Sequence, residues 1–108
     1  MEFVRIASIT DIPAGKMMKV NAEGKDILIV NLNGVVYALD NRCPHMGGSL
    51  DNGTLEGNTV VCPRHGAQFD VKTGVAMGKA KIGPLKFLTT NVKSYEVRID
   101  GSDVMVGF

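Results

Sequence analysis

Every cysteine and every histidine of the 108-residue chain lies in one of two short segments, Cys43-Pro44-His45 and Cys62-Pro63-Arg64-His65. Thiolate sulfur is a soft ligand and imidazole nitrogen an intermediate one, so four such groups together suit zinc or iron. This clustering favours a metal site over two buried thiols and two surface histidines. Two cysteines could form at most one disulfide, and nothing in the sequence points to an oxidising compartment.

The elements that position these segments are predicted to be β-strands, because apolar and β-branched residues alternate along the chain. Turn signals such as Asn33-Gly34 and Asp100-Gly101 separate the strands. A single helical turn is expected at residues 8–13, ended by Pro13. The predicted strands are Val4–Ala7, Met17–Val20, Ile27–Asn31, Val35–Leu39, Thr59–Cys62, Gln68–Asp70, Tyr95–Ile99 and Val104–Val106.

Short strands at close spacing predict an all-β fold, an antiparallel sandwich or small barrel. The length of 108 residues indicates one domain spanning residues 1–108. The expected core includes Val30, Val36, Leu39, Val97 and Ile99.

Both Cys-His segments follow predicted strands, so they are expected to lie in two hairpin loops that close over a metal centre. Pro44 and Pro63 stiffen these loops. Gly47, Gly48 and Gly66 would let the backbone approach inorganic sulfide closely. Spacing alone does not choose iron over a structural zinc ion, since zinc also accepts two Cys and two His.

The motif Cys-x-His, sixteen residues and then Cys-x-x-His resembles the Rieske iron–sulfur signature. The flanks match as well: residues 43–50 read Cys-Pro-His-Met-Gly-Gly-Ser-Leu, residues 62–70 read Cys-Pro-Arg-His-Gly-Ala-Gln-Phe-Asp, and Thr73-Gly74 follows. The resemblance covers the whole chain and implies a Rieske-like fold with a cluster-binding subdomain of two hairpin loops. That subdomain is expected at about residues 41–86, inserted in a β base domain.

By this resemblance the cofactor is one Rieske-type [2Fe-2S] cluster. Cys43 and Cys62 are implied to bind one iron, and His45 and His65 the other. Two neutral imidazoles in place of thiolates remove negative charge, which raises the reduction potential above that of a four-cysteine cluster.

Departures from the family pattern refine this expectation. In Rieske subunits of cytochrome bc-type complexes two extra cysteines join the loops, whereas Gly48 and Arg64 stand at those places here. The same high-potential proteins carry a Ser and a Tyr that donate hydrogen bonds to cluster sulfur, whereas this chain has Ala67 and Phe69. Without those donors the potential is expected near the low end of the Rieske range, roughly −150 mV.

The function implied is a soluble one-electron carrier, not itself an enzyme, that passes electrons from a reductase to a terminal oxygenase or another acceptor. All histidines are committed to metal, which leaves little for catalysis. Two alternatives stay open: a small Rieske subunit of a multicomponent reductase such as nitrite reductase, and a zinc-stabilised binding module. A third loop at Gly83-Pro84 is the candidate shield for the cluster, with a plain surface turn as the alternative.

Charge distribution and the lack of visible targeting signals limit the classes of partner and the location that can be expected. Residues 42–86 hold six Lys or Arg and three acidic residues, a net charge of +3, whereas the remainder has a net charge of −2. A basic rim near His45 and His65 would steer acidic redox partners, although a solvated surface without a role would look the same. The overall charge of +1 gives no bias toward nucleic acid. No signal peptide or membrane span is visible, so a cytoplasmic protein is expected.

Overall fold

The computed structural model describes residues 1–44, 48–64, 66–77, 79–82, 85–88 and 91–108, and these residues form antiparallel β-sheets with two short 3-10 helices and no α-helix. None of the described segments has a helix with the length and apolar character that crossing a membrane requires. The elements are β1 (Phe3–Ser8), η1 (Ile9–Asp11), β2 (Met17–Ala22), β3 (Lys25–Leu32), β4 (Val35–Asp40), η2 (Leu50–Asn52), β5 (Thr54–Glu56), β6 (Thr59–Val61), β7 (Gln68–Asp70), β8 (Ala76–Met77), β9 (Lys79–Ile82), β10 (Leu85–Leu88), β11 (Ser94–Tyr95), β12 (Val97–Asp100) and β13 (Asp103–Gly107).

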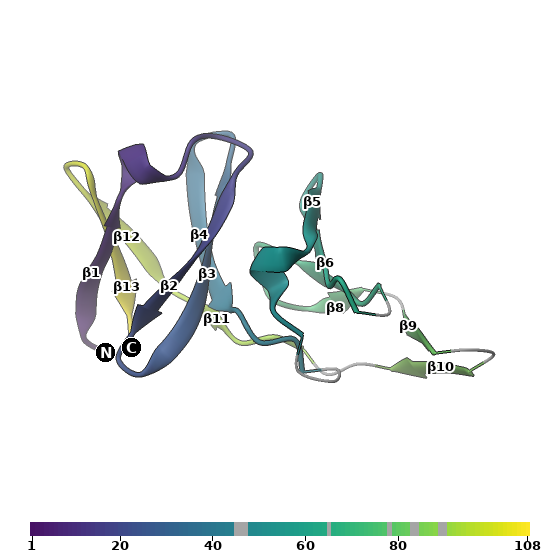
Figure 1. Ribbon diagram of the computed structural model, residues 1–108. Helices are drawn as coiled ribbons and strands as arrows, with labels where there is room; N and C mark the ends of the chain where they lie inside the picture. The colour runs from purple at the N-terminus through teal and green to yellow at the C-terminus, as the bar shows by residue number, and fades with distance from the viewer. Residues whose placement is uncertain (45–47, 65, 78, 83–84, 89–90) are drawn as a thin grey trace.

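Two sheets, which we call the base sheets, hold both ends of the chain. One has the strand order β1-β13-β12 and the other β11-β4-β3-β2. A third sheet, the site sheet, has the order β5-β6-β7-β8, and β9 and β10 form a separate two-stranded ribbon. The site sheet lies beside the base sheets and the ribbon extends away from them (Figure 1). The all-β antiparallel architecture expected from the sequence is therefore confirmed.

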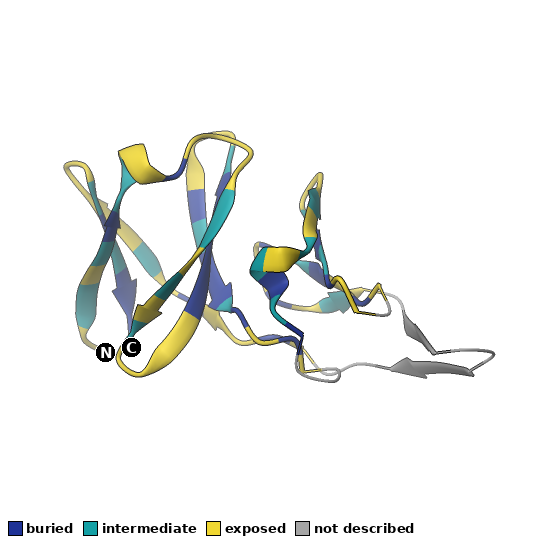
Figure 2. Ribbon diagram, in the orientation of Figure 1, coloured by how far each residue is buried: buried dark blue, intermediate teal, exposed yellow. Residues whose placement is uncertain are grey.

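Strand β3 is the centre of the molecule because both of its faces are buried. Ile27 and Ile29 pack into one hydrophobic cluster with β1, β4 and β13, which we call the base core. Leu28 and Val30 point the other way, into a cluster that we call the site core. The site core consists of Leu28, Val30, Leu39, Cys43, Leu50, Val60, Cys62, Ala67, Phe69, Val71 and Val92. The side chains of the unbroken apolar run 27–30 thus connect the site core with the base core. Buried residues are concentrated along β3 and β4 (Figure 2).

The hairpin between β3 and β4 turns at the residues predicted from the sequence. Asn33 and Gly34 have φ values of 53° and 94°, and Leu32 pairs with Val35 across the turn. Both turn residues therefore adopt the left-handed conformation that a two-residue hairpin requires. The helical turn expected at residues 8–13 is also present, as η1.

The predicted strand Tyr95–Ile99 is wrong as a single element. Tyr95 pairs with Ala38 in one base sheet, whereas Val97–Asp100 pairs with β13 in the other, so the chain changes sheets at Glu96. Ile99 was expected in the core and is instead 49% exposed, because it lies on β12 at the edge of its sheet. Val97 is only half-buried, while the other three expected core residues, Val30, Val36 and Leu39, are buried.

Four strands have no counterpart in the sequence prediction, namely β5, β8, β9 and β10. Strand β8 has two residues and β5 has three, too few for a period-2 pattern to emerge. Strands β5 and β8 form because β6 and β7 offer them free hydrogen-bonding edges. Such pairing depends on the tertiary structure and leaves no local pattern in the sequence.

Tyr95 ties the returning chain to the end of β4. Its hydroxyl donates a hydrogen bond of 2.5 Å to Asp40 Oδ1, and Lys93 Nζ lies 4.9 Å from the centre of its ring. Burial and, after it, the Asp40 carboxylate raise the pKa of Tyr95. This contact lies one residue before the chain enters the segment that carries Cys43.

The raised pKa of Tyr95 predicts an alkaline loss of stability. The folded protein holds this proton more tightly than the unfolded chain, so its contribution is complete below the unfolded pKa of about 10 and declines as the pH rises above that value. We expect the free energy of unfolding, measured by urea denaturation between about pH 8 and pH 11, to fall more steeply for the wild type than for Tyr95→Phe. Parallel pH profiles for the two proteins would contradict this assignment.

Candidate metal centre

Both cysteines lie in the site core. Cys43 is 0% and Cys62 1% exposed, and neither forms a disulfide. They come from segments nineteen positions apart in the sequence, yet they share one hydrophobic cluster. The structure thus brings together the two predicted thiolate ligands in a site that water does not reach.

The first cysteine stands near the base of a closed loop, residues 41–51, which we call the first loop. Arg42 and Ser49 form an isolated antiparallel bridge. One step further, the Cys43 N–H donates a hydrogen bond of 2.7 Å to the Gly48 carbonyl oxygen. These contacts hold the two sides of the loop together at its base, and we call the sequence between Cys43 and Gly48, residues 44–47, the tip of the first loop.

The second cysteine occupies the same place in a second hairpin. Val61 pairs with Gln68 where β6 and β7 begin to separate, and the Cys62 N–H donates a hydrogen bond of 2.7 Å to the Ala67 carbonyl oxygen. We call residues 61–68 the second loop; its tip is residues 63–66. In both loops the cysteine is bonded to the residue five positions later, so each tip spans four residues and holds one of the two histidines.

His45 and His65 lie outside the described residues, as do Met46 and Gly47. Their assignment as ligands stays a prediction from the sequence. The candidate shielding turn at Gly83-Pro84 lies outside the described residues as well.

The two loops lie against each other at Gly48. A Cβ atom on Gly48 would stand 2.9 Å from Cys62 Sγ and 3.4 Å from Cγ and Cδ of Arg64. The absence of a side chain therefore lets the first loop pack closely against a buried thiol. Two buried thiols on adjacent hairpins fit the binding of an inorganic cluster by soft sulfur ligands.

The same contact bears on the departure noted at Gly48 and Arg64. These two positions, at which the family resemblance implies bridging cysteines in high-potential Rieske proteins, are neighbours in the structure. Here Gly48 lies against the aliphatic part of the Arg64 side chain, so no disulfide joins the loops at these two positions.

Ala67 and Phe69 are 1% and 0% exposed and belong to the site core. Both side chains are hydrocarbon only, so neither offers a hydroxyl donor to a sulfur atom. The apolar surroundings lower the local dielectric constant and disfavour added negative charge.

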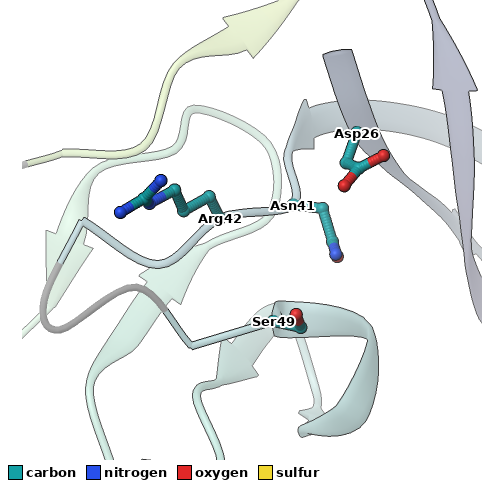
Figure 3. A pocket seen from close by; sticks show the side chains of 4 residues that line it. All are labelled: Asp26, Asn41, Arg42 and Ser49. Atoms are coloured by element: carbon teal, nitrogen blue, oxygen red, sulfur yellow. The ribbon is translucent and has the colours of Figure 1, made fainter. Parts of the chain in front are cut away.

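Polar groups border this apolar site on the side of the base sheets. Asp26, Asn41, Arg42 and Ser49 line a pocket where β3 meets the first loop (Figure 3). Asn41, which is 2% exposed and lies between β4 and Cys43, was not among the site residues predicted from the sequence. An asparagine two residues before a candidate ligand is the only signal that could have pointed to it.

Comparison with known proteins gives a consistent result. The family model described as Rieske [2Fe-2S] domain matches residues 2–96. The ferredoxin component of a naphthalene 1,2-dioxygenase system from Pseudomonas aeruginosa is 35% identical over 105 residues, covering 97% of this chain and 94% of that protein. The ferredoxin component of naphthalene 1,2-dioxygenase and salicylate 5-hydroxylase systems from a Ralstonia species is 38% identical, covering 96% and 93%.

Solved structures agree. The ferredoxin of carbazole 1,9a-dioxygenase from Nocardioides aromaticivorans superposes with a TM-score of 0.84 at 28% identity, covering 99% of this chain and 98% of that one. A complex of reduced oxygenase and oxidized ferredoxin in carbazole 1,9a-dioxygenase contains a chain that matches with a TM-score of 0.81 at 27% identity, covering 97% and 92%.

Proposed function

This chain belongs to the Rieske [2Fe-2S] domain family, and from that premise we propose that it receives single electrons from a reductase and delivers them to a terminal oxygenase. Its cofactor is a Rieske-type [2Fe-2S] cluster. Its relatives are named ferredoxin components, so the chain is an electron carrier and not an enzyme. The observation that supports the proposal most directly is the pair of buried thiols on adjacent hairpins.

We propose that Cys43 and Cys62 hold one iron and that His45 and His65 hold the other. The family motif supports all four, and the geometry of the two described cysteines fits their share. When bound, the cluster supplies reversible one-electron oxidation and reduction. The site core keeps water from the two sulfur atoms, and the neutral histidines spare the site two negative charges.

The proposed organisation is a single domain of residues 1–108, with about residues 41–86 forming the cluster-binding part. The base sheets are built from segments on either side of that range, which supports this division. We also propose a cytoplasmic location, with which two cysteines outside disulfides are consistent.

The composition of the metal centre tests the proposal. We expect the purified protein to contain about two irons and two acid-labile sulfides per chain, and the reduced form to give an electron paramagnetic resonance signal with a mean g value of about 1.9. Replacing His65→Cys should lower the midpoint potential where a cluster still assembles, because a thiolate adds negative charge.

A zinc-stabilised module would instead be colourless and contain one zinc ion and no acid-labile sulfide. That composition would contradict the electron-carrier proposal. Stable co-purification with a large catalytic subunit would instead favour the role of a small subunit in a multicomponent reductase.

The hydrocarbon side chains of Ala67 and Phe69 predict a low midpoint potential, roughly −150 mV. Phe69→Tyr and Ala67→Ser should each raise it by on the order of 60 mV, the one-electron equivalent of about 1.4 kcal/mol from one new hydrogen bond to sulfur. Spectroelectrochemical titration measures the shift.

Phe3→Tyr is the matched control, since Phe3 is half-buried on β1 beneath Arg98 and outside the site core. It should leave the potential unchanged. A wild-type midpoint above about +100 mV would contradict the argument.

We propose that redox partners dock at the loop tips, near His45 and His65. Arg42 and Arg64 are both exposed; Arg42 immediately precedes Cys43 in the first loop, and Arg64 immediately precedes His65 in the second. An acidic partner would be attracted to this end of the molecule, and the attraction would weaken as salt screens the charges.

Steering by these arginines predicts a salt-dependent rate. The double variant Arg42→Gln/Arg64→Gln should slow reduction of the partner oxygenase by about tenfold at low ionic strength, and raising the ionic strength to about 0.5 M should remove the difference. Stopped-flow absorbance measures the second-order rate. Lys16→Gln/Lys19→Gln removes the same charge from exposed sites on and before β2 and is the control. Equal slowing by both pairs would refute specific docking at the tips.

A further inference from the structure

Asn31 and Asn41 are the two buried polar residues in the described part of the chain, and they lie at opposite ends of the β3–β4 hairpin. Asn41, at the base of the first loop, has every polar group bonded. Its backbone N–H donates to the Asp26 carbonyl oxygen at 2.9 Å, and its carbonyl oxygen accepts from the Leu50 N–H at 2.8 Å. Its side-chain Nδ2 donates to Asp51 Oδ1 at 2.8 Å, and its Oδ1 accepts from the Asp51 N–H at 2.9 Å.

These bonds fix the base of the first loop from two directions. The Asp26 bond ties Asn41 to β3 of the base sheet, and the Leu50 and Asp51 bonds tie it to η2. The side chain extends across the pocket toward the turn that carries Ser49, whereas Arg42 points away (Figure 3). The next two backbone pairings of the loop, the Arg42–Ser49 bridge and the Cys43–Gly48 hydrogen bond, directly follow the residues that Asn41 fixes.

The second loop needs no such side chain. It continues the paired strands β6 and β7, which β5 and β8 flank in a four-stranded sheet. In the described part of the first loop, the pairing above its base consists of the isolated bridge between Arg42 and Ser49 and the backbone bond from Cys43 to Gly48. A paired side-chain contact with Asp51 therefore supplies the register that a longer ladder supplies to the other loop.

We propose that Asn41, paired with Asp51, is a positioning residue that sets where Cys43 and the first loop tip stand relative to the second loop. This inference rests on the proposed function, because its target is the cluster. The side-chain hydrogen bonds of Asn41 go to Asp51, so we argue its action on the cluster through the backbone of the loop.

A second substitution can restore the hydrogen bonds that a change at Asn41 breaks. The Asn41 amide donates to the Asp51 carboxylate and accepts from the Asp51 backbone N–H. Asn41→Asp keeps the acceptor but sets two carboxylates against each other. Asn41→Asp/Asp51→Asn restores both bonds, since the new amide donates to the new carboxylate.

Asn31 provides a matched control for the same substitution. Its Nδ2 donates to the Ile12 carbonyl oxygen at 2.7 Å, and its Oδ1 accepts from the Gly34 N–H at 2.8 Å. Asn31→Asp therefore loses the same kind of buried bond, at the end of the hairpin remote from Cys43.

The experiment compares the wild type, the two single variants and the swapped double variant, each purified with its cluster. We expect Asn41→Asp to shift the electron paramagnetic resonance g values and the midpoint potential and to speed iron loss to a chelator by about tenfold. Asn31→Asp should lower the melting temperature without moving the spectrum or the potential. The swapped variant should return all three cluster properties to the wild-type values.

The failures are distinguishable. A wild type without iron and sulfide would overturn the proposed function and this inference together. A wild type with a normal cluster, accompanied by Asn41→Asp and Asn31→Asp variants that keep the wild-type spectrum and potential, would overturn the positioning role alone. A shifted Asn41→Asp spectrum that the swap does not restore would likewise reject the Asn41–Asp51 pair as the cause.

Discussion

Two buried thiols at the bases of two adjacent hairpins form the constraint on which this structure depends. Sulfur ligands can serve one metal centre only when separate parts of the chain hold them side by side. Here the same backbone bond, from the cysteine N–H to the carbonyl five residues later, closes both loops. Gly48 then allows the first loop to approach Cys62 closely, because any larger residue would bring a Cβ atom within 2.9 Å of its Sγ. The base sheets, the site core and the hydrogen bonds of Asn41 all help to maintain this arrangement.

The base sheets contribute rigidity rather than chemistry. Because β3 is buried on both faces, the site core and the base core share one strand, and the first loop contributes Cys43 and Leu50 to the site core. Interiors packed in this way resist small displacements, which favours an electron carrier because little reorganisation follows a change of charge. The hydrogen bond from Tyr95 to Asp40 joins β11, where the chain re-enters the base sheet, to the end of β4.

Local features of the fold could be predicted, and non-local ones could not. The apolar run at Ile27–Val30 and the Asn33-Gly34 turn carry their signals within a few residues, and both predictions agree with the structure. The change of sheet at Glu96 leaves no local mark, because alternation continues through it. In the site, the motif pointed to Cys43 and Cys62 by residue type, whereas the role of Asn41 follows only from its distance to Asp51. Side-chain pairs that close a loop depend on tertiary structure that periodicity does not encode.

The way the loops are braced fits a low-potential carrier. A covalent bridge at positions 48 and 64 and hydroxyl donors at 67 and 69 would constrain the site and favour added negative charge, as the resemblance implies for high-potential relatives. This chain has a glycine against an arginine stem in the first case and hydrocarbon in the second. At the base of the first loop, hydrogen bonds join Asn41 to Asp26, Leu50 and Asp51. Hydrogen bonds that end on Asp26, Leu50 and Asp51 fix the geometry of the loop, whereas donors to sulfur would stabilise a reduced cluster. Support of the loop and tuning of the potential can therefore be carried by different residues.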